Sequence, residues 1–177
     1  MLPRAPEFSR DPRHPGFALG HEYHARLATP FAVLGIRTAG ARLAEIVYLP
    51  LGAATLAPQN KLAEAACRQI ENYIDDPEFR FDLPFEFDGT DFRRRVWRAI
   101  SEIPCGRTLT YGEVARELGS APRAVGGACG ANRLPLVIPC HRVVARSGIG
   151  GFMHARGGAP IAIKQWLLRH EQAHEHA

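Results

Sequence analysis

Apolar and polar residues follow a β-type pattern early in the chain and a helical pattern after it. Phe31–Ile36 and Leu43–Leu49 are short apolar runs, and the polar segment between them contains Gly40, so we expect a β-hairpin. From residue 61 to residue 75, apolar side chains recur every three or four positions, which predicts an amphipathic helix that stops before a proline. Residues 1–20 contain four prolines and are expected to form an irregular arm.

Further helices are predicted in the second half of the chain. Asp91 is a candidate N-cap for a helix whose apolar stripe comprises Phe92, Val96, Trp97, Ile100 and Ile103. Thr110–Glu113 matches a capping box at the start of another helix, which Gly119 ends. Ser120 is a candidate cap for the helix after that, which runs to about Asn132. Two short helices joined by a glycine-containing turn are typical of a helix-turn-helix, although many such pairs bind nothing.

Composition and charge exclude several classes of protein. The 177 residues are 46% hydrophobic and 23% charged, which excludes a wholly disordered chain, a collagen-like repeat and a coiled coil. We find no apolar run long enough to span a bilayer and no secretory signal, and therefore expect a cytoplasmic protein. The net charge is −3 over residues 1–90 and +6 over residues 91–146, so we place a domain boundary near residue 90. The basic segment favours a polyanionic partner only modestly, because arginine supplies 20 of the 22 basic residues along the whole chain.

The cysteines are candidates for metal binding or for covalent chemistry. No Cys-x-x-Cys pair occurs among Cys67, Cys105, Cys129 and Cys140, and we expect no metal and no cofactor.

Cys140 stands in a Pro-Cys-His-Arg segment between apolar flanks that predict an extended chain. A thiol needs a base or a positive environment to become a nucleophile, and His141 and Arg142 follow it directly. Because neighbours on an extended segment point to opposite sides, His141 would reach the thiol through a water. Glu171, in a helix predicted over residues 160–172, could orient the imidazole. The same pattern also fits a buried cysteine beside a satisfied core histidine.

A series of motifs in the second half resembles the O6-alkylguanine-DNA alkyltransferase family. The motifs are Phe92…Val96-Trp97, Ile103-Pro104-x-Gly106, Thr110-Tyr111-Gly-Glu-Val-Ala115, Arg123-Ala-Val-Gly126, Asn132, Ile138-Pro-Cys-His-Arg-Val-Val144, Lys164-x-Trp-Leu-Leu168 and His170-Glu171. They run in order over residues 91–171, whereas the N-terminal half fits the family loosely.

The resemblance implies a catalytic role for five residues. Cys140 would accept the alkyl group, His141 would take the thiol proton through a water, and Glu171 would hold the imidazole. Tyr111 would donate a hydrogen bond or proton to the leaving guanine, and Asn132 would brace the turn that presents Cys140. The thioether product has no hydrolysable bond, so the transfer would be irreversible, with one event per protein molecule.

The resemblance also implies double-stranded DNA as the partner, bound through its minor groove. The base to be repaired, O6-methylguanine and in some cases O4-methylthymine, would be flipped out of the stack, and Arg123 would fill the space that it leaves. The other expected DNA contacts are Ala124, Gly126, Ala128 and Arg133. The guanine itself would meet Tyr111, the backbone of Val143, and Gly157 and Gly158 in a loop, residues 145–159, that is longer than is common in the family.

The expected architecture is α/β in two parts, and the protein is expected to be a monomer. The resemblance implies a ribonuclease-H-like N-terminal domain over residues 1–90, with a small antiparallel sheet and a helix. Residues 91–177 would form a mainly helical DNA-binding and catalytic domain that contains the helix-turn-helix.

Three other functions compete with alkyl transfer. A non-enzymatic alkyltransferase-like protein that binds DNA damage would lack the thiol of Cys140. A helix-turn-helix regulator would have no need for Cys140, His141, Tyr111 and Glu171 together. A cysteine hydrolase would need an oxyanion hole, and none can be located in the sequence.

Overall fold

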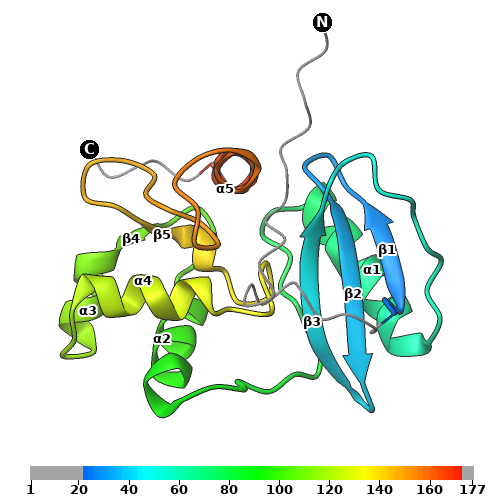
Figure 1. The fold of residues 1–177 in the computed structure, drawn as a ribbon, viewed down its shortest axis with the longest axis horizontal. Helices are drawn as coiled ribbons and strands as arrows, with labels where there is room; N and C mark the ends of the chain where they lie inside the picture. Colours follow the sequence, from blue (N-terminus) through cyan, green and yellow to red (C-terminus); the bar gives the residue numbers. More distant parts are fainter. Residues whose placement is uncertain (1–21, 173–177) are drawn as a thin grey trace, which may run out of the picture.

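Within residues 22–172, the fold consists of a small sheet with one helix, and of four further helices with a short two-stranded pair among them (Figure 1). The computed structural model describes residues 22–172, so the arm expected over residues 1–20 lies outside the described range. The coarse expectation of an α/β protein with a small antiparallel sheet is confirmed.

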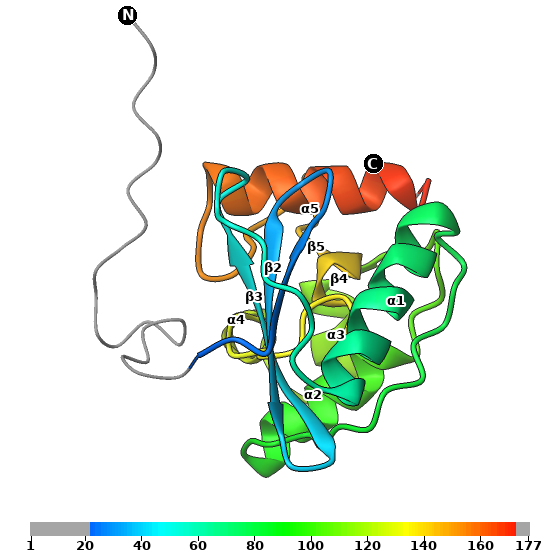
Figure 2. The same ribbon diagram turned by 90° about the vertical axis from the view of Figure 1, so that its right-hand side faces the viewer.

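The sheet has three antiparallel strands in the order β1-β2-β3. β2 (Val33–Ala39) and β3 (Arg42–Leu49) form the predicted hairpin, and Gly40 in its turn has a φ of +58°. β1 (Ala25–Ala28) was not predicted, because four residues are too few to show an alternating pattern. Helix α1 (Lys61–Asp75) lies along one face of the sheet and has the bounds that its periodicity predicts (Figure 2).

β3 is an edge strand, and it connects the sheet to the rest of the molecule. Its backbone donates hydrogen bonds from Leu43 N to Pro84 O, at 2.8 Å, and from Ile46 N to Arg133 O, at 2.9 Å. These bonds satisfy backbone N–H groups on the edge of the sheet, which could otherwise pair with a strand of another molecule. They also fix the position of the segment around Arg133 against the sheet.

The helices of the second half are α2 (Asp91–Ser101), α3 (Tyr111–Glu117), α4 (Pro122–Gly130) and α5 (Ala159–His170). The predicted capping box at the start of α3 is confirmed.

Two predicted caps are wrong by one residue. Thr90, not Asp91, caps α2 by accepting a hydrogen bond from Arg93 N. Ala121, not Ser120, is the N-cap of α4, and this helix start has no side-chain cap. Pro122 at the first helical position compensates, since proline has no N–H to satisfy there.

Two short strands bring distant parts of the second half together. β4 (Leu109–Thr110) pairs in parallel with β5 (Val143–Val144). A 3₁₀ turn, Cys140–Arg142, directly precedes β5, and α3 directly follows β4. The pairing therefore places the start of α3 close to the segment that carries the nucleophile candidate.

Helix α5 lies across the top of the molecule in Figure 2. It contacts β5 through Lys164, and it also contacts the part of the chain that contains the three-stranded sheet and α1. The Trp166 ring lies 4.6 Å from that of Phe31 in the sheet group, and His170 packs edge-on against Tyr73 of α1. No helix within residues 22–172 is long and apolar enough to cross a membrane.

Candidate active site

Cys140 begins a 3₁₀ turn and is 4% exposed. The sequence predicts an extended chain here, and the structure corrects that prediction: Arg142 N donates to Pro139 O at 2.9 Å, which closes a turn over residues 139–142. Only Val143 and Val144 are extended, as strand β5. The turn, rather than a strand, therefore sets the direction of the Cys140 and His141 side chains.

Asn132, just after α4, joins the Cys140 turn to the end of that helix. Its amide nitrogen donates to Ile138 O at 2.9 Å and to Cys140 Sγ at 3.2 Å, and its Oδ1 accepts a bond from Leu134 N. Through these three bonds, one side chain holds the chain on both sides of the turn and touches the sulfur itself.

Glu171 accepts four hydrogen bonds at the end of α5. His141 Nε2 lies 2.9 Å from Oε1, and the Tyr73 hydroxyl donates to the same oxygen at 2.8 Å. Arg142 donates from Nε to Oε2 and from Nη2 to Oε1, at 2.9 and 2.8 Å. Burial alone raises the pKa of Glu171, but His141 and Arg142 outweigh burial and hold it well below its ordinary value. Glu171 is therefore a carboxylate that can only accept hydrogen bonds.

This arrangement determines which nitrogen of His141 can act as a base. Burial lowers the pKa of His141 by more than Glu171 raises it, so the imidazole is neutral. Because Glu171 only accepts, the proton of a neutral ring must be on Nε2. Nδ1 is then an acceptor, and it is buried without a hydrogen-bond partner.

Lys164 is fully buried in α5 and lies near the thiol. Its ammonium donates to Val143 O at 2.6 Å and to Gly151 O at 2.9 Å. Burial lowers its pKa to about 8, against the opposing effect of the Cys140 and Cys129 thiolates. For Cys140, burial raises the pKa by more than the hydrogen bond from Asn132 and the charge of Lys164 lower it, so the net pKa is raised and the thiol keeps its proton at neutral pH. A thiolate at Cys140 thus has an amide and an ammonium to stabilise it.

Tyr111, the first residue of α3, directs its hydroxyl toward the loop after β5. The hydroxyl donates to Gly151 O at 3.0 Å, so Tyr111 and Lys164 share one carbonyl. Burial raises the pKa of Tyr111, and the neighbouring thiols raise it further, so the phenol keeps its proton at neutral pH. A Cβ on Gly126 of α4 would lie 4.0 Å from the ring, at van der Waals distance.

The expected DNA-contacting positions of α4 lie on different faces of the helix. Arg123 and Ala124 are exposed near its start, and Gly126 is partly exposed beside Tyr111. Ala128 is 2% exposed, and its carbonyl accepts a bond from the Trp97 indole at 2.8 Å. The prediction that Ala128 meets DNA is therefore wrong: it lies one turn after the buried Val125, on the face that packs against α2.

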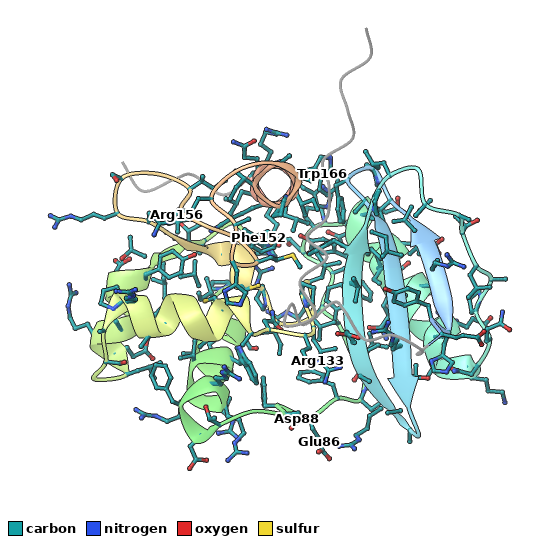
Figure 3. The ribbon with its side chains drawn as sticks, viewed as in Figure 1. Glu86, Asp88, Arg133, Phe152, Arg156 and Trp166 are labelled. Carbon is teal, nitrogen blue, oxygen red and sulfur yellow. The ribbon has the colours of Figure 1, made fainter. Side chains whose placement is uncertain are left out.

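The other residues expected to contact DNA or the guanine have partners within the protein or lie away from Tyr111. Arg133 lies between the end of α4 and β3 (Figure 3), where its side chain is half exposed and pairs with Glu45 at 3.5 Å. The Val143 carbonyl already accepts the Lys164 ammonium. Gly157 and Gly158 are exposed just before α5, and Gly158 is its N-cap. In the same loop it is Gly150 and Gly151 that adjoin Tyr111.

The loop between β5 and α5 turns back into the molecule at Phe152 and outward at Arg156 (Figure 3). Phe152 exchanges two backbone hydrogen bonds with Ala155, and the residues between them, Met153 and His154, both have positive φ. The His154 ring packs directly on Gly130 of α4, where a Cβ would lie only 2.2 Å from the ring. The loop is thus in contact with the last turn of α4.

Sequence reasoning gave no separate role to Lys164 or Tyr73, and it offered Arg142 as a positive group for the thiol, whereas the Arg142 guanidinium donates to Glu171. A lysine among the apolar positions of the last helix, between Ile163 and Leu167, was the available signal for Lys164. Tyr73 gave no comparable signal, since it reads as one more apolar position of α1. Its contact with Glu171 joins residues 98 positions apart.

Residues 91–173 match the family model described as 6-O-methylguanine DNA methyltransferase, DNA binding domain. A methylated-DNA–protein-cysteine methyltransferase of Mycolicibacterium paratuberculosis is 41% identical over 115 residues, which cover 63% of this chain and 67% of that protein. The chain belongs to the O6-methylguanine-DNA methyltransferase family. The family expected from the sequence motifs is thereby confirmed.

Solved structures of this family share the fold. The crystal structure of the Mycobacterium tuberculosis O6-methylguanine methyltransferase has a TM-score of 0.71 at 33% identity, over 84% of this chain and 92% of that one. The M. tuberculosis protein has also been crystallised in complex with DNA, with a TM-score of 0.69, 33% identity, and coverage of 83% and 91%.

The curated relatives extend beyond the matched region. A methylated-DNA–protein-cysteine methyltransferase of Salmonella typhimurium is 50% identical over 86 residues, which make up 47% of each protein. The chain thus spans about half the length of this relative, and 26% of the length of the Salmonella regulatory protein ada.

Proposed function

We propose that this methyltransferase family member repairs DNA by moving the alkyl group of O6-alkylguanine to its own Cys140. The observation that carries the proposal is the buried pair of His141 and Glu171 beside the thiol, in which the free nitrogen of the imidazole is an acceptor. The names of the relatives, which are methylated-DNA–protein-cysteine methyltransferases, support the same reaction.

The first step is removal of the thiol proton. The Cys140 proton passes to a water as that water gives a proton to His141 Nδ1, and Glu171 stabilises the resulting imidazolium through Nε2. Lys164 and the Asn132 amide stabilise the thiolate that remains. A neutral His141 with its proton on Nε2 is the protonation state that this step needs.

The second step is displacement at the alkyl carbon. The thiolate forms a C–S bond while the C–O bond to the guanine breaks, and the electron pair goes to the purine. Tyr111, which keeps its proton at neutral pH, gives a hydrogen bond or proton to the leaving guanine. The thioether at Cys140 has no hydrolysable bond, so each molecule reacts once and irreversibly.

We further propose that α3 and α4 act as a helix-turn-helix in the minor groove of double-stranded DNA. The exposed Arg123 would fill the space left by the flipped nucleotide, and the small Ala124 and Gly126 would allow a close approach of the backbones. The net charge of +6 over residues 91–146 suits a polyanion, and the DNA complex of the M. tuberculosis relative supports this partner. The half-exposed Arg133 would contribute charge at the edge of this surface.

We also propose roles for the two parts of the chain and for the loop glycines. Residues 1–90 would form a ribonuclease-H-like supporting domain and residues 91–177 the DNA-binding and catalytic domain. The protein would act as a monomer, because Cys140, its proton acceptor and Tyr111 all come from one chain. The backbone of Val143 and the loop glycines Gly157 and Gly158 would complete the guanine pocket once DNA is bound.

The test is the intact mass of the protein after incubation with a duplex that contains one O6-methylguanine. We expect one added methyl group per molecule, mapped to Cys140, with no addition in Cys140→Ala. Cys67, Cys105 and Cys129 serve as internal controls in the same spectrum, because they are free thiols that the reaction should leave unmodified. Tight binding to the lesion without an adduct would instead identify a damage-binding protein and refute alkyl transfer.

A further inference from the structure

Three buried side-chain atoms in the described part of the chain lack a hydrogen-bond partner: Arg26 Nε, Tyr48 OH and His141 Nδ1. The His141 atom belongs to the proposed proton relay. The Tyr48 hydroxyl is not used by that relay, and it comes from the sheet rather than from the catalytic half of the molecule. Its position relative to Cys140 therefore needs an explanation.

Tyr48 lies on β3 and is 3% exposed. Its ring packs against Phe31, at 6.2 Å between centroids, and against Phe152 of the loop that adjoins Lys164 and Tyr111, at 6.0 Å. Two residues earlier on the same strand, Ile46 is hydrogen-bonded to the carbonyl of Arg133. The residue before Arg133 is Asn132, whose amide donates to Cys140 Sγ, so β3 is hydrogen-bonded to the same short segment that holds the Cys140 turn.

The electrostatics agree with this position. Burial raises the pKa of Tyr48 well above its ordinary value, and the charge of a Cys140 thiolate raises it further. Tyr48 is thus a protonated phenol in the electric field of the thiolate. Its hydroxyl can donate one hydrogen bond.

A buried hydroxyl without a hydrogen-bond partner loses its bonds to water and gains none in return, so such groups in proteins nearly always have a partner. Buried waters typically make about three hydrogen bonds to polar groups that the protein itself leaves unpaired. Tyr48 OH as a donor and His141 Nδ1 as an acceptor are two such groups, and the S–H of Cys140, whose sulfur accepts from Asn132, supplies a further donor.

We propose that Tyr48 and His141 hold one shared water against Cys140, which makes Tyr48 a positioning residue for the proton transfer. This inference rests on the proposed function. The phenol donates to the water oxygen, the thiol donates to the same oxygen, and the water donates to Nδ1. As the thiol proton moves to the water, a water proton moves to Nδ1, and the phenol keeps its own proton throughout.

The test uses Tyr48→Phe, which retains the ring contacts and removes only the hydroxyl. The rate of Cys140 methylation is measured by peptide mass, once with the O6-methylguanine duplex and once with methyl iodide, as a function of pH. We expect a loss of about three- to tenfold at neutral pH, the effect of one hydrogen bond. The loss should disappear at alkaline pH, where the thiolate forms without the relay. Tyr23→Phe, at a half-buried tyrosine that packs on Arg37, is the matched control and should leave the rate unchanged.

A double variant separates a shared water from a general structural effect. If both residues hold the same water, Tyr48→Phe should add nothing to the loss caused by His141→Ala. Additive losses, an equal slowing at every pH, or an unchanged rate in Tyr48→Phe would each overturn the inference. Methyl iodide measures the reactivity of the thiol in the absence of DNA. A protein that fails to react with the duplex would therefore refute the proposed function, and its reaction with methyl iodide would still decide the role of Tyr48.

Discussion

Replacing Glu171 with glutamine tests how strongly the four hydrogen bonds at the end of α5 hold the site. Glutamine has nearly the same shape, but it turns one acceptor oxygen into an NH₂ donor and removes the negative charge. The partner most affected is Arg142, whose guanidinium donates to both carboxylate oxygens and whose side chain is 13% exposed. The variant therefore leaves a largely buried cation without its counter-charge.

Removal of one partner of a buried ion pair typically costs about 3–5 kcal/mol. Because a protein of ordinary stability unfolds at a cost of about 5–15 kcal/mol, this loss is a large fraction of the total. For a chain of this length it corresponds to a fall in Tm of about 10 °C. Denaturant titration of wild type and Glu171→Gln at neutral pH measures the difference in the free energy of unfolding directly.

The pH dependence provides a second measurement on the same pair of proteins. An unfolded glutamate has a pKa of about 4.3, and the folded pKa of Glu171 lies well below that. Its stabilising effect is therefore fully present above the unfolded pKa and is lost as the pH falls toward the folded pKa. The two stability curves should converge in acid, because glutamine does not titrate.

The matched control is Glu86→Gln, which removes the carboxylate of an exposed ion pair with Arg42. An exposed pair contributes about 0–1 kcal/mol, so this variant should unfold almost like wild type. The reasoning would be refuted by equal losses in the two variants, or by a Glu171→Gln deficit that persists unchanged in acid.

Two further predictions concern α4. Arg123→Ala should slow repair of duplex DNA much more than reaction with a free O6-alkylguanine base, because the free base needs no flipping. Single-turnover rates measure both reactions, and equal losses would show that Arg123 does not fill the space left by a flipped nucleotide. Gly130→Ala should change the free energy of unfolding by less than about 1 kcal/mol, because the His154 ring that the new Cβ would meet is the end of an exposed side chain that can move aside, and alanine is the better helix former. Thermal unfolding measures the change, and a large loss that His154→Ala restores would refute this reasoning.

The elements that the sequence predicts well are those whose signal is local. The β2–β3 hairpin, α1 and the capping box of α3 follow from periodicity and from cap residues within a few positions. The two misplaced caps show the limit of such signals, since Thr90 beside Asp91 can cap α2 equally well, and α4 begins after Ala121 without any side-chain cap. The turn at Cys140 was missed because its apolar flanks have the composition of a strand, while the structure closes it with backbone bonds.

The candidate site was predictable only in part for a related reason. The motifs around Cys140 identify the residues that are near one another in the chain, together with Glu171 through the resemblance. Tyr48 and Tyr73 come from the sheet group and reach the site through tertiary packing alone. A single sequence carries no signal for such contacts, because each tyrosine satisfies its own strand or helix pattern equally well without them.

The hydrogen bond between Tyr73 and Glu171 has a consequence for the order in which the protein folds. It closes a loop of 98 residues, for which the chain entropy cost is about 4 kcal/mol. Contacts of such high sequence separation tend to form slowly, after local hairpins and helices. The carboxylate that holds His141 would then be completed late in folding. A partly folded chain would keep Cys140 without its organised base, and a protein that reacts only once would not expend its thiol before it can recognise DNA.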